Sequence, residues 1–262
     1  MNRYIRSRLF APLLILALLM LWEAVGRLAH LPPYIVPVPS QIGRALWEDR
    51  VSLWENSLTT LGEMGIGLAF SLIVGWSTAV AMVQWRGLAG ALYPLSVVSQ
   101  MIPTLAIAPV LVLWFGYGIW PKAIVTVLLT FFPLVVTTYD GLRSTDPELI
   151  DLYRSFGASN ARIFWSVRWP YALPHFFSGL KMAVTWAVVG AAVAEWVGAQ
   201  AGLGYYIQQR SHQFATAGVF AAVVVLALWG LLFFGFITWI ERRAVWWAYA
   251  RPVEWEPEQP QA

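Results

Sequence analysis

Apolar residues gather into six long stretches separated by polar connections. Each stretch approaches the roughly 20 residues that an α-helix needs to cross a hydrocarbon core of about 30 Å. We therefore predict membrane-spanning helices at 9–25, 58–83, 92–114, 120–138, 173–197 and 219–240. The alternative for the first stretch is a signal peptide, because Arg3, Arg6 and Arg8 precede it. A weak cleavage sequence and the five further spans favour a retained anchor.

Composition agrees with a membrane protein and excludes several other classes. Of the 262 residues, 59% are apolar and 12% are charged, whereas soluble domains carry about 25% charged residues. The net charge of +3 gives no basic footprint for nucleic acid. The absence of cysteine excludes disulfides and thiolate metal sites. The predicted fold class is all-α: a polytopic membrane protein of one domain, 1–262, with a frayed tail at about 252–262.

Lysine and arginine divide unevenly between the two sets of connections. With the N-terminus inside, twelve of the 17 basic residues lie on the inner side and five on the outer side. Because cytoplasmic loops are enriched in basic residues, both termini are predicted to be cytoplasmic. The same orientation puts the long polar connection 141–171 in the cytoplasm, between the fourth and fifth spans.

Two spans carry patterns that bear on helix packing. Small residues recur at every fourth position of the second span: Gly67, Ser71, Gly75 and Ala79. They predict a groove into which another helix packs closely. The third span contains Pro94, Pro103 and Pro109, which free backbone carbonyls at membrane depth, so it is expected to face protein or a wet cavity. A proline-kinked helix with only a structural role is the alternative.

Candidate pathway residues are polar or helix-breaking side chains within the spans: Gln100, Pro103, Thr104 and Glu195. Ionisable residues inside a span are functional by default, which applies to Glu63 and Glu195. Both lie near the outer ends of their spans, so a hydrated position or an ion pair is the alternative. Lys181, near the inner start of the fifth span, is expected to extend its ammonium group to the interface.

The connection 141–171 predicts two short helices joined by a glycine corner. Thr145-Asp146-Pro147-Glu148 fits a capping box in which Thr145 is the N-cap, with Pro147 in the first turn. An apolar stripe follows at helical spacing: Leu149, Leu152, Tyr153 and Phe156. Gly157 suits the left-handed end of this helix, and Ser159 caps a second helix that must stop before Pro170. The pair forms either a rigid knob that transmits force to a soluble partner or an amphipathic linker on the inner leaflet.

The same connection resembles the EAA loop of the membrane subunits of ABC importers. That pattern reads Glu-Ala-Ala, three residues, Gly, nine residues, Ile, any residue and Leu-Pro. Residues 151–157 and 167–170 match its spacing, with Gly157 and Pro170 identical and Asp151 in place of the glutamate. Two of the departures, Leu152 and Tyr153, replace the alanine pair, and Trp169 replaces the leucine.

Shorter stretches extend the resemblance over roughly 31–207, at 33–40, 102–109, 113–116 and 202–204. They are similar to the branch that imports nitrate, sulfonates, taurine and the pyrimidine precursor of thiamine. The resemblance implies a subunit of the bacterial inner membrane that works with a second permease copy, as a homodimer. It also implies cytoplasmic ATP-binding subunits and an external or periplasmic solute-binding protein as partners. The loop residues implied in coupling to the ATPase are Asp151, Arg154, Gly157, Ala158, Ser159, Arg162, Ile163, Val167 and Pro170.

No motif in the chain indicates chemistry of its own. The phosphate loop Gly-x4-Gly-Lys-Ser/Thr is absent, so we expect no bound cofactor, with ATP used by the partner subunit. His-Glu-x-x-His is also absent and the three histidines do not cluster, so no catalytic or metal residue is predicted for an intramembrane enzyme. A secondary transporter, the other alternative class, would show internal repeats, and none is evident.

Charge and aromatic content bear on the identity of the solute. Anions favour pathways lined by basic side chains or helix N-termini, yet the charges within the spans are mainly acidic. Aromatic residues make up 15% of the chain and can stack on a planar ring. A thiamine pyrimidine precursor or a similar heterocycle is therefore favoured over sulfonate, taurine or nitrate.

Overall fold

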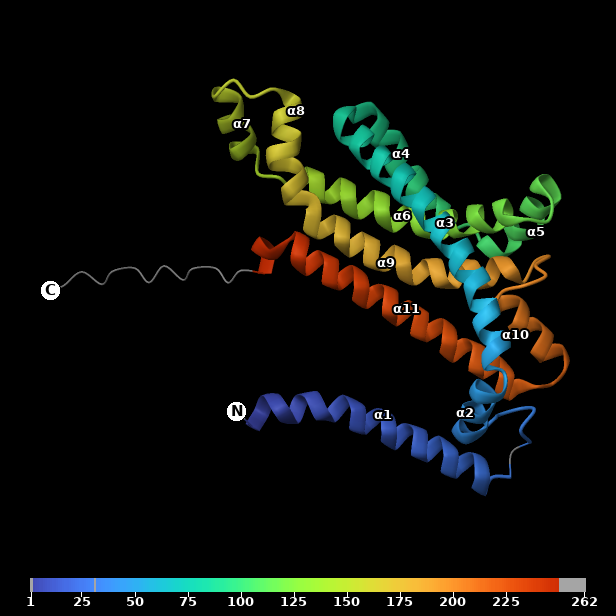
Figure 1. Ribbon diagram of the computed structural model, residues 1–262. Helices are drawn as coiled ribbons and strands as arrows, with labels where there is room; N and C mark the ends of the chain where they lie inside the picture. The colour runs from blue at the N-terminus through green and yellow to red at the C-terminus, as the bar shows by residue number, and fades with distance from the viewer. Residues whose placement is uncertain (1, 31, 250–262) are drawn as a thin grey trace.

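The computed structural model describes residues 2–30 and 32–249, and this part of the chain is helical throughout its regular structure (Figure 1). Its α-helices are α1 (Asn2–Leu28), α2 (Pro39–Glu48), α3 (Arg50–Gln84), α4 (Arg86–Ser99), α5 (Thr104–Phe115), α6 (Ile119–Arg143), α7 (Pro147–Ser155), α8 (Asn160–Ile163), α9 (Trp169–Glu195), α10 (Leu203–His212) and α11 (Thr216–Ala244). A π-helical turn, Phe164–Arg168, joins α8 to α9, and a 3₁₀ turn, Trp246–Tyr249, follows α11. The predicted frayed tail at about 252–262 lies outside the described residues.

Four stretches of helix in the described chain are long and apolar enough to cross a membrane. They are α3, α6, the continuous stretch Asn160–Glu195 and α11, and they correspond to the predicted spans 58–83, 120–138, 173–197 and 219–240. A bent pair, α4 with α5, raises the count to five. The predicted six spans are therefore not confirmed, although α1 covers 9–25 as one continuous helix.

The prediction of one helix over 92–114 is wrong, because α4 and α5 meet at 99°. Pro103 is the N-cap of α5 and has extended backbone, with ψ of 104°. Proline has no N–H for the helical ladder and disfavours helical geometry in the residue before it, here Ile102. Gln100 ends α4 three residues earlier, so the chain turns within a short exposed segment.

The centre of the molecule is the antiparallel pair α6 and α9, with α3 crossing α6 and α11 alongside α9 (Figure 1). Glycines allow this close approach. A Cβ on Gly67 of α3 would lie 2.5 Å from Thr126 Cβ of α6, and one on Gly179 of α9 would lie 2.8 Å from the Pro133 carbonyl oxygen. The predicted small-residue stripe of α3 is thus filled by α6 of the same chain, with Ser71 hydrogen-bonded to Thr130.

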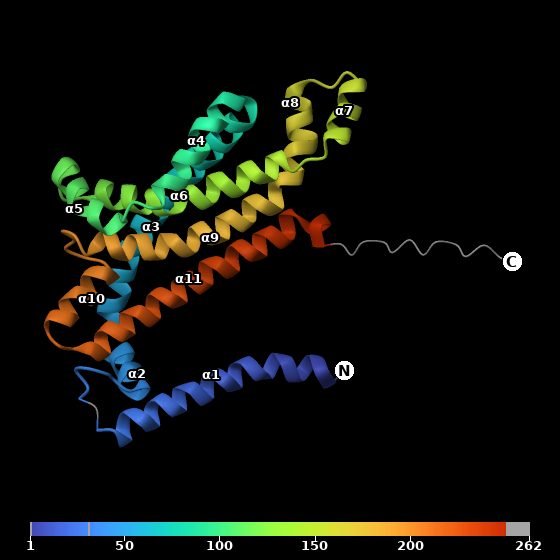
Figure 2. The same cartoon turned by 180° about the vertical axis from the view of Figure 1, so that it is seen from behind.

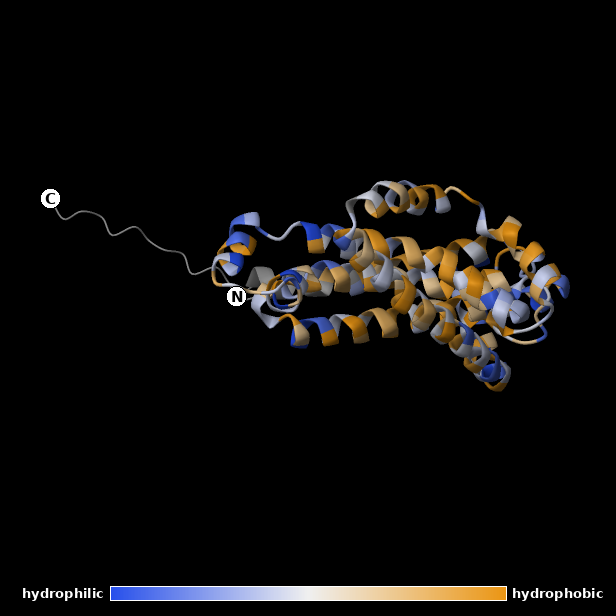
Figure 3. Ribbon diagram, turned by 90° about the horizontal axis from the view of Figure 1, so that it is seen from above, coloured by the Kyte–Doolittle hydropathy of each residue, from blue (hydrophilic) through white to orange (hydrophobic). Residues whose placement is uncertain are grey.

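The two ends of the bundle carry different elements. The start of α1, the end of α11 and the pair α7–α8 lie at one end, whereas α2 and α10 lie at the other (Figures 1 and 2). Apolar residues cover the sides of the helices and hydrophilic residues gather toward the ends (Figure 3). This arrangement is the one expected if the basic end faces the cytoplasm, and the direction of the chain across the membrane stays a prediction.

Candidate coupling loop and solute pathway

The candidate coupling loop begins at α7, whose N-cap is Asp146. Its carboxylate accepts a hydrogen bond from the Glu148 backbone N–H at 2.9 Å, and Pro147 occupies the first turn as predicted. The predicted capping box is wrong by one residue, because the Thr145 hydroxyl donates instead to the Leu142 carbonyl at 3.3 Å. A carboxylate is favoured at this position because it complements the positive end of the helix dipole.

A glycine corner joins α7 to α8, as the sequence indicates. Gly157 has φ of +76° and its N–H donates to the Arg154 carbonyl at 2.9 Å. The Ala158 N–H then donates to the Tyr153 carbonyl at 3.1 Å, which closes the end of α7. Ser159 accepts from the Arg162 N–H at 3.3 Å and caps α8. Local backbone chemistry therefore sets the angle between the two short helices.

The prediction that the second short helix, α8, stops before Pro170 is wrong. It passes through the π-helical turn Phe164–Arg168 into α9, so that Asn160–Glu195 is one continuous helix of 36 residues. In a π turn each N–H bonds to the carbonyl five residues earlier instead of four. This wider turn accommodates a proline, which has no N–H to donate to the preceding turn. At about 1.5 Å per residue this helix is about 54 Å long and connects the coupling loop to the far end of the bundle.

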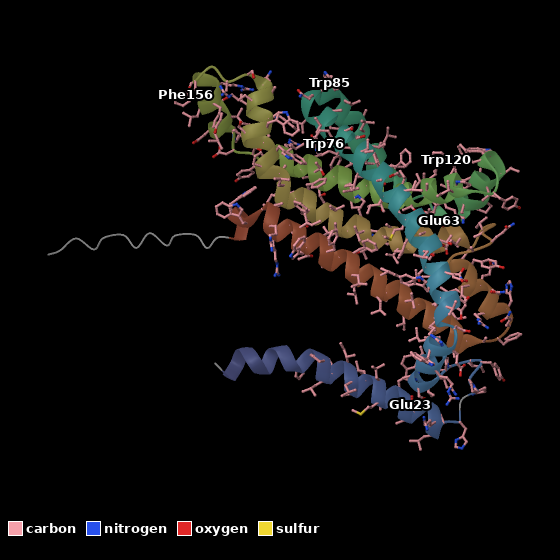
Figure 4. All side chains as sticks on the ribbon, viewed as in Figure 1. Glu23, Glu63, Trp76, Trp85, Trp120 and Phe156 are labelled. Carbon is pink, nitrogen blue, oxygen red and sulfur yellow. The ribbon has the colours of Figure 1, made fainter. Side chains whose placement is uncertain are left out.

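The loop has one buried side and one open side. Ile163, Phe164 and Val167 are buried, and Phe164 packs with Leu142 and Ala172. The predicted apolar stripe of α7 is open at two of its four positions: Leu152 is 50% and Phe156 80% exposed, whereas Leu149 and Tyr153 are half-buried. Figure 4 shows Phe156 at the tip of this loop, away from the bundle. These two side chains are free to enter a partner's groove.

Tryptophans brace the base of the loop, which the sequence analysis did not anticipate. Trp169 meets Trp76 of α3 edge to face at a centroid distance of 5.9 Å. Trp165 stacks on the same ring at 6.4 Å, and Trp169 also contacts Phe176 at 5.5 Å. The departure of Trp169 from the EAA pattern therefore supplies an aromatic contact between the loop and α3.

Three of the four candidate pathway residues lie together at the break between α4 and α5. Gln100 and Pro103 are exposed and Thr104 is half-buried. The Gln100 side-chain amide donates to the Leu128 carbonyl of α6 at 3.4 Å. The break thus presents polar side-chain and backbone groups on an open surface beside α6.

Glu195, the fourth candidate, lies apart from them and is fully buried. It accepts hydrogen bonds from the Thr60 hydroxyl at 2.7 Å and from the Gly204 N–H. Thr60 in turn accepts from the Leu203 N–H at 2.8 Å. A side chain enclosed in this way lines no open surface of the single subunit.

The same contacts complete a clamp around the turn 202–204. Asn56 accepts from the Gly202 N–H at 2.8 Å, so all three amides of the turn are bound by α3 and the end of α9. Gly202 has φ of +116°, and a Cβ there would lie 2.2 Å from the carboxyl carbon of Glu195. The sequence singled out Glu195 and the turn 202–204 separately, and only the i, i+4 spacing of Asn56 and Thr60 could have pointed to the α3 side of the clamp.

Two ion pairs join helices inside the bundle. Glu63 of α3, labelled in Figure 4, pairs with Lys122 of α6, which agrees with the ion-pair alternative for this acid. Lys181 pairs with Glu241 in the last turn of α11 at 2.7 Å, and its extension to the membrane interface stays a prediction. A carboxylate within reach removes the need for water at the ammonium group. Both lysines within the apolar helices are thereby neutralised.

A polar contact also joins α2 to α10, at the end of the bundle opposite α7 and α8. Asp49 pairs with Arg210 at 2.7 Å and accepts from the Tyr206 hydroxyl at 2.6 Å. Burial, together with the hydrogen bond to Asp49, raises the pKa of Tyr206 to about 12. The phenol therefore stays protonated and keeps donating at physiological pH. Within the described residues, 2–30 and 32–249, no cluster of side chains could hold a metal ion.

Comparison with known families and structures agrees with this architecture. Residues 67–246 match the family model described as binding-protein-dependent transport system inner membrane component. Among solved structures, a chain of the MetNI methionine ABC transporter, in inward-facing conformations, superimposes with a TM-score of 0.57. That match covers 82% of this chain and 99% of the other at 19% identity, which shows a shared fold.

Several permeases are similar over nearly their whole length. The chain is 43% identical over 236 residues to the formylaminopyrimidine transport permease ThiX of Halalkalibacterium halodurans, covering 90% of this chain and 94% of that protein. It is 33% identical over 249 residues to the riboflavin transport permease RibX of Chloroflexus aurantiacus, covering 94% and 93%. It is 29% identical over 239 residues to the taurine transport permease TauC of Escherichia coli, covering 88% and 86%. The family match and these identities show that the chain belongs to the inner membrane components of binding-protein-dependent transport systems, as a permease of an ABC importer.

Proposed function

We propose that this permease imports a pyrimidine precursor of thiamine or a closely similar heterocycle. The observation that carries the proposal is the 43% identity to the formylaminopyrimidine permease over 94% of that protein. The riboflavin permease, at 33% identity, also carries a heterocycle. The taurine and aliphatic sulfonate permeases are less similar, at 29% and 27%.

The charges inside the bundle support a neutral or cationic solute. A sulfonate or nitrate would be stabilised by a cation along its route. Lys122 and Lys181 are instead paired with carboxylates. The exposed break between α4 and α5 offers uncharged polar groups, among them Gln100 and Thr104. These groups suit a polar heterocycle better than an anion.

Coupling to ATP hydrolysis would run through the loop α7–α8. Leu152 and Phe156 would enter the ATPase, while Asp151 and Arg154, themselves paired at 3.0 Å, would lie at the rim of the contact. Because α8 continues into α9, movement of the loop would reach Glu195 and the clamped turn 202–204 at the opposite end. The solute-binding protein would then dock at that end, beside α2 and α10.

The solute is tested by reconstituting the permease with its partner ATPase and solute-binding protein. We expect ATP-dependent uptake of labelled formylaminopyrimidine that a large excess of taurine does not reduce. Uptake of taurine, or inhibition by taurine at the same concentration as unlabelled formylaminopyrimidine, would overturn the heterocycle assignment. Full stimulation of ATP hydrolysis without a binding protein would count against the importer mechanism.

The docking surface is tested separately with Phe156→Ser. Burial of a phenylalanine side chain contributes about 1.5–3 kcal/mol, so the ATPase should bind roughly ten- to a hundredfold more weakly. Phe236→Ser is the matched control, since Phe236 is 54% exposed on α11, away from the loop. Equal recovery of the ATPase with both variants would show that the α7 stripe is not the dock.

A second copy of the chain would complete the pathway. The small-residue stripe of α3 is occupied by α6 of the same subunit and is not free for a second copy, whereas the bent pair α4–α5 is open. Along this face the exposed apolar side chains include Leu95, Met101 and Leu105. The mass of the purified complex with its ATPase tests this stoichiometry, and a transporting complex with one permease subunit would refute it.

A further inference from the structure

A cavity of about 910 Å³ lies at the end of the bundle that carries α7 and α8. Its walls come from the end of α3, the first half of α4, the end of α6, the middle of α7 and the π-helical turn. In Figure 1, α4 leans away from α6 toward this end of the molecule. The cavity is separate from the open stripe of α7 and from the break at Gln100.

Two arginines make one side of the cavity positive. Arg143 comes from the last turn of α6 and Arg168 from the π-helical turn, and both line it together with a single carboxylate, Asp140. Within 2–30 and 32–249, neither guanidinium forms an ion pair with a carboxylate, in contrast to Arg154 and Arg210. Guanidinium groups match the oxygens of a phosphate in a bidentate geometry.

The opposite side of the cavity is apolar and aromatic. Met82, Ala89 and Pro94 line it beside the rings of Tyr93 and Tyr139, whose centroids are 5.9 Å apart. These residues lie at or next to the ends of spans that are predicted to face the cytoplasm, where lipid headgroups are expected to meet acyl chains. A ligand with an anionic head and an apolar body therefore fits both sides.

We propose that this cavity binds a phosphate-bearing ligand, with the phosphate held between Arg143 and Arg168. Basic pockets between helices on the cytoplasmic side of a membrane are where anionic lipid headgroups bind. The apolar wall matches a phospholipid such as phosphatidylglycerol, and free phosphate is the other source of the same chemistry. A phosphate bound here would join α4 to the base of the coupling loop. The proposal is independent of which solute is transported.

Two kinds of variant test the site without disturbing packing. Gly90 lines the cavity, and a Cβ added there meets no atom within 4 Å. The backbone at this position therefore leaves room for a side chain, and Gly90→Phe is designed to occupy the cavity. Gly235→Phe on α11 is its control, because a Cβ there also meets no atom within 4 Å. Arg143→Gln and Arg168→Gln remove the positive charges, and Arg242→Gln at the same end of the bundle removes a charge outside the cavity.

The experiment is native mass spectrometry of the purified full-length chain titrated with phosphatidylglycerol, phosphatidylcholine or inorganic phosphate. We expect phosphatidylglycerol to bind more tightly than phosphatidylcholine. An arginine near an anionic lipid contributes about fivefold, so each substitution should weaken binding about fivefold and both together about thirtyfold. Gly90→Phe should remove the bound lipid, whereas the controls Gly235→Phe and Arg242→Gln should retain it. Thermal melting confirms that each variant is folded.

The outcomes distinguish a phospholipid from free phosphate as the ligand, and both from a cavity that binds neither. Competition by millimolar inorganic phosphate, with loss of that effect in the arginine variants, would identify free phosphate as the ligand. Specific retention of phosphatidylglycerol without such competition would identify the lipid. Equal binding of both lipids, or unchanged binding of lipid and of phosphate in the double arginine variant and in Gly90→Phe, would overturn the proposal.

Discussion

The buried carboxylate of Glu195 offers a sharp test of the clamp around the turn 202–204. Its two oxygens accept hydrogen bonds from the Thr60 hydroxyl and from the Gly204 N–H. Replacement by leucine removes both acceptors from a site with no exposed surface. The Thr60 hydroxyl can turn fully to the Asn56 carbonyl, 3.1 Å away, whereas the Gly204 N–H loses the hydrogen bond that it donates to Glu195.

The expected loss of stability follows from leaving the Gly204 N–H without a hydrogen-bond acceptor. A buried donor without a partner costs about 1–3 kcal/mol, so Glu195→Leu should lower the free energy of unfolding by about that amount. At roughly 2–4 °C per kcal/mol, the melting temperature should fall by about 2–12 °C. Glu55→Leu is the control, since Glu55 is an exposed acid on α3 and its loss should change melting little.

Glu195→Gln separates hydrogen bonding from charge. The amide oxygen can accept from the Gly204 N–H while the amide nitrogen donates to Thr60, which keeps the clamp closed. We expect a melting temperature close to that of the unmodified chain, measured in detergent by intrinsic tryptophan fluorescence. Melting of Glu195→Gln as low as that of Glu195→Leu would refute the hydrogen-bond account. Normal melting with lost uptake would show instead that the charge of Glu195 acts in transport.

Three further predictions concern the loop, the helix packing and the orientation. Gly157→Val should abolish uptake while the subunit stays in the membrane, because a β-branched residue at φ of +76° costs about 1–2 kcal/mol, whereas Gly157→Asn should retain most uptake. Gly67→Val should lower stability by about 1–3 kcal/mol by overpacking α3 against α6, and Gly65→Val, at an open position of the same helix, should not; equal melting of the two would contradict the packing. A single cysteine at Ser211 should react with an impermeant thiol reagent on intact cells and one at Ser144 should not, and the reverse result would invert the topology.

The sequence alone determined the elements whose stability is local. Four of the predicted spans became long helices, because a bilayer-sized apolar run has no other way to satisfy its backbone. Gly157 and Ser159 likewise predicted the corner between α7 and α8, since a left-handed residue and a capping hydroxyl act on their immediate neighbours. The spacing of that corner also pointed to the family that the comparisons then showed.

Proline shows where local reasoning stopped. Pro103 breaks the third predicted span, yet Pro109, Pro133 and Pro174 lie inside continuous helices. Pro170 is accommodated by a π-helical turn rather than ending its helix. The residue type is the same in each case, and what differs is whether neighbouring helices hold the chain straight or leave it free to turn.

Only the tertiary structure decided which charged side chains meet. Glu195 is 135 residues from Thr60 in the chain, and Lys181 is 60 residues from Glu241, so neither contact has a sequence spacing that predicts it. Each depends on how α3, α9 and α11 cross, which is set by small residues packed against α6 and α9. A pattern along one helix specifies which face is buried but not which partner it meets, because the crossing angle and register arise only when the helices assemble.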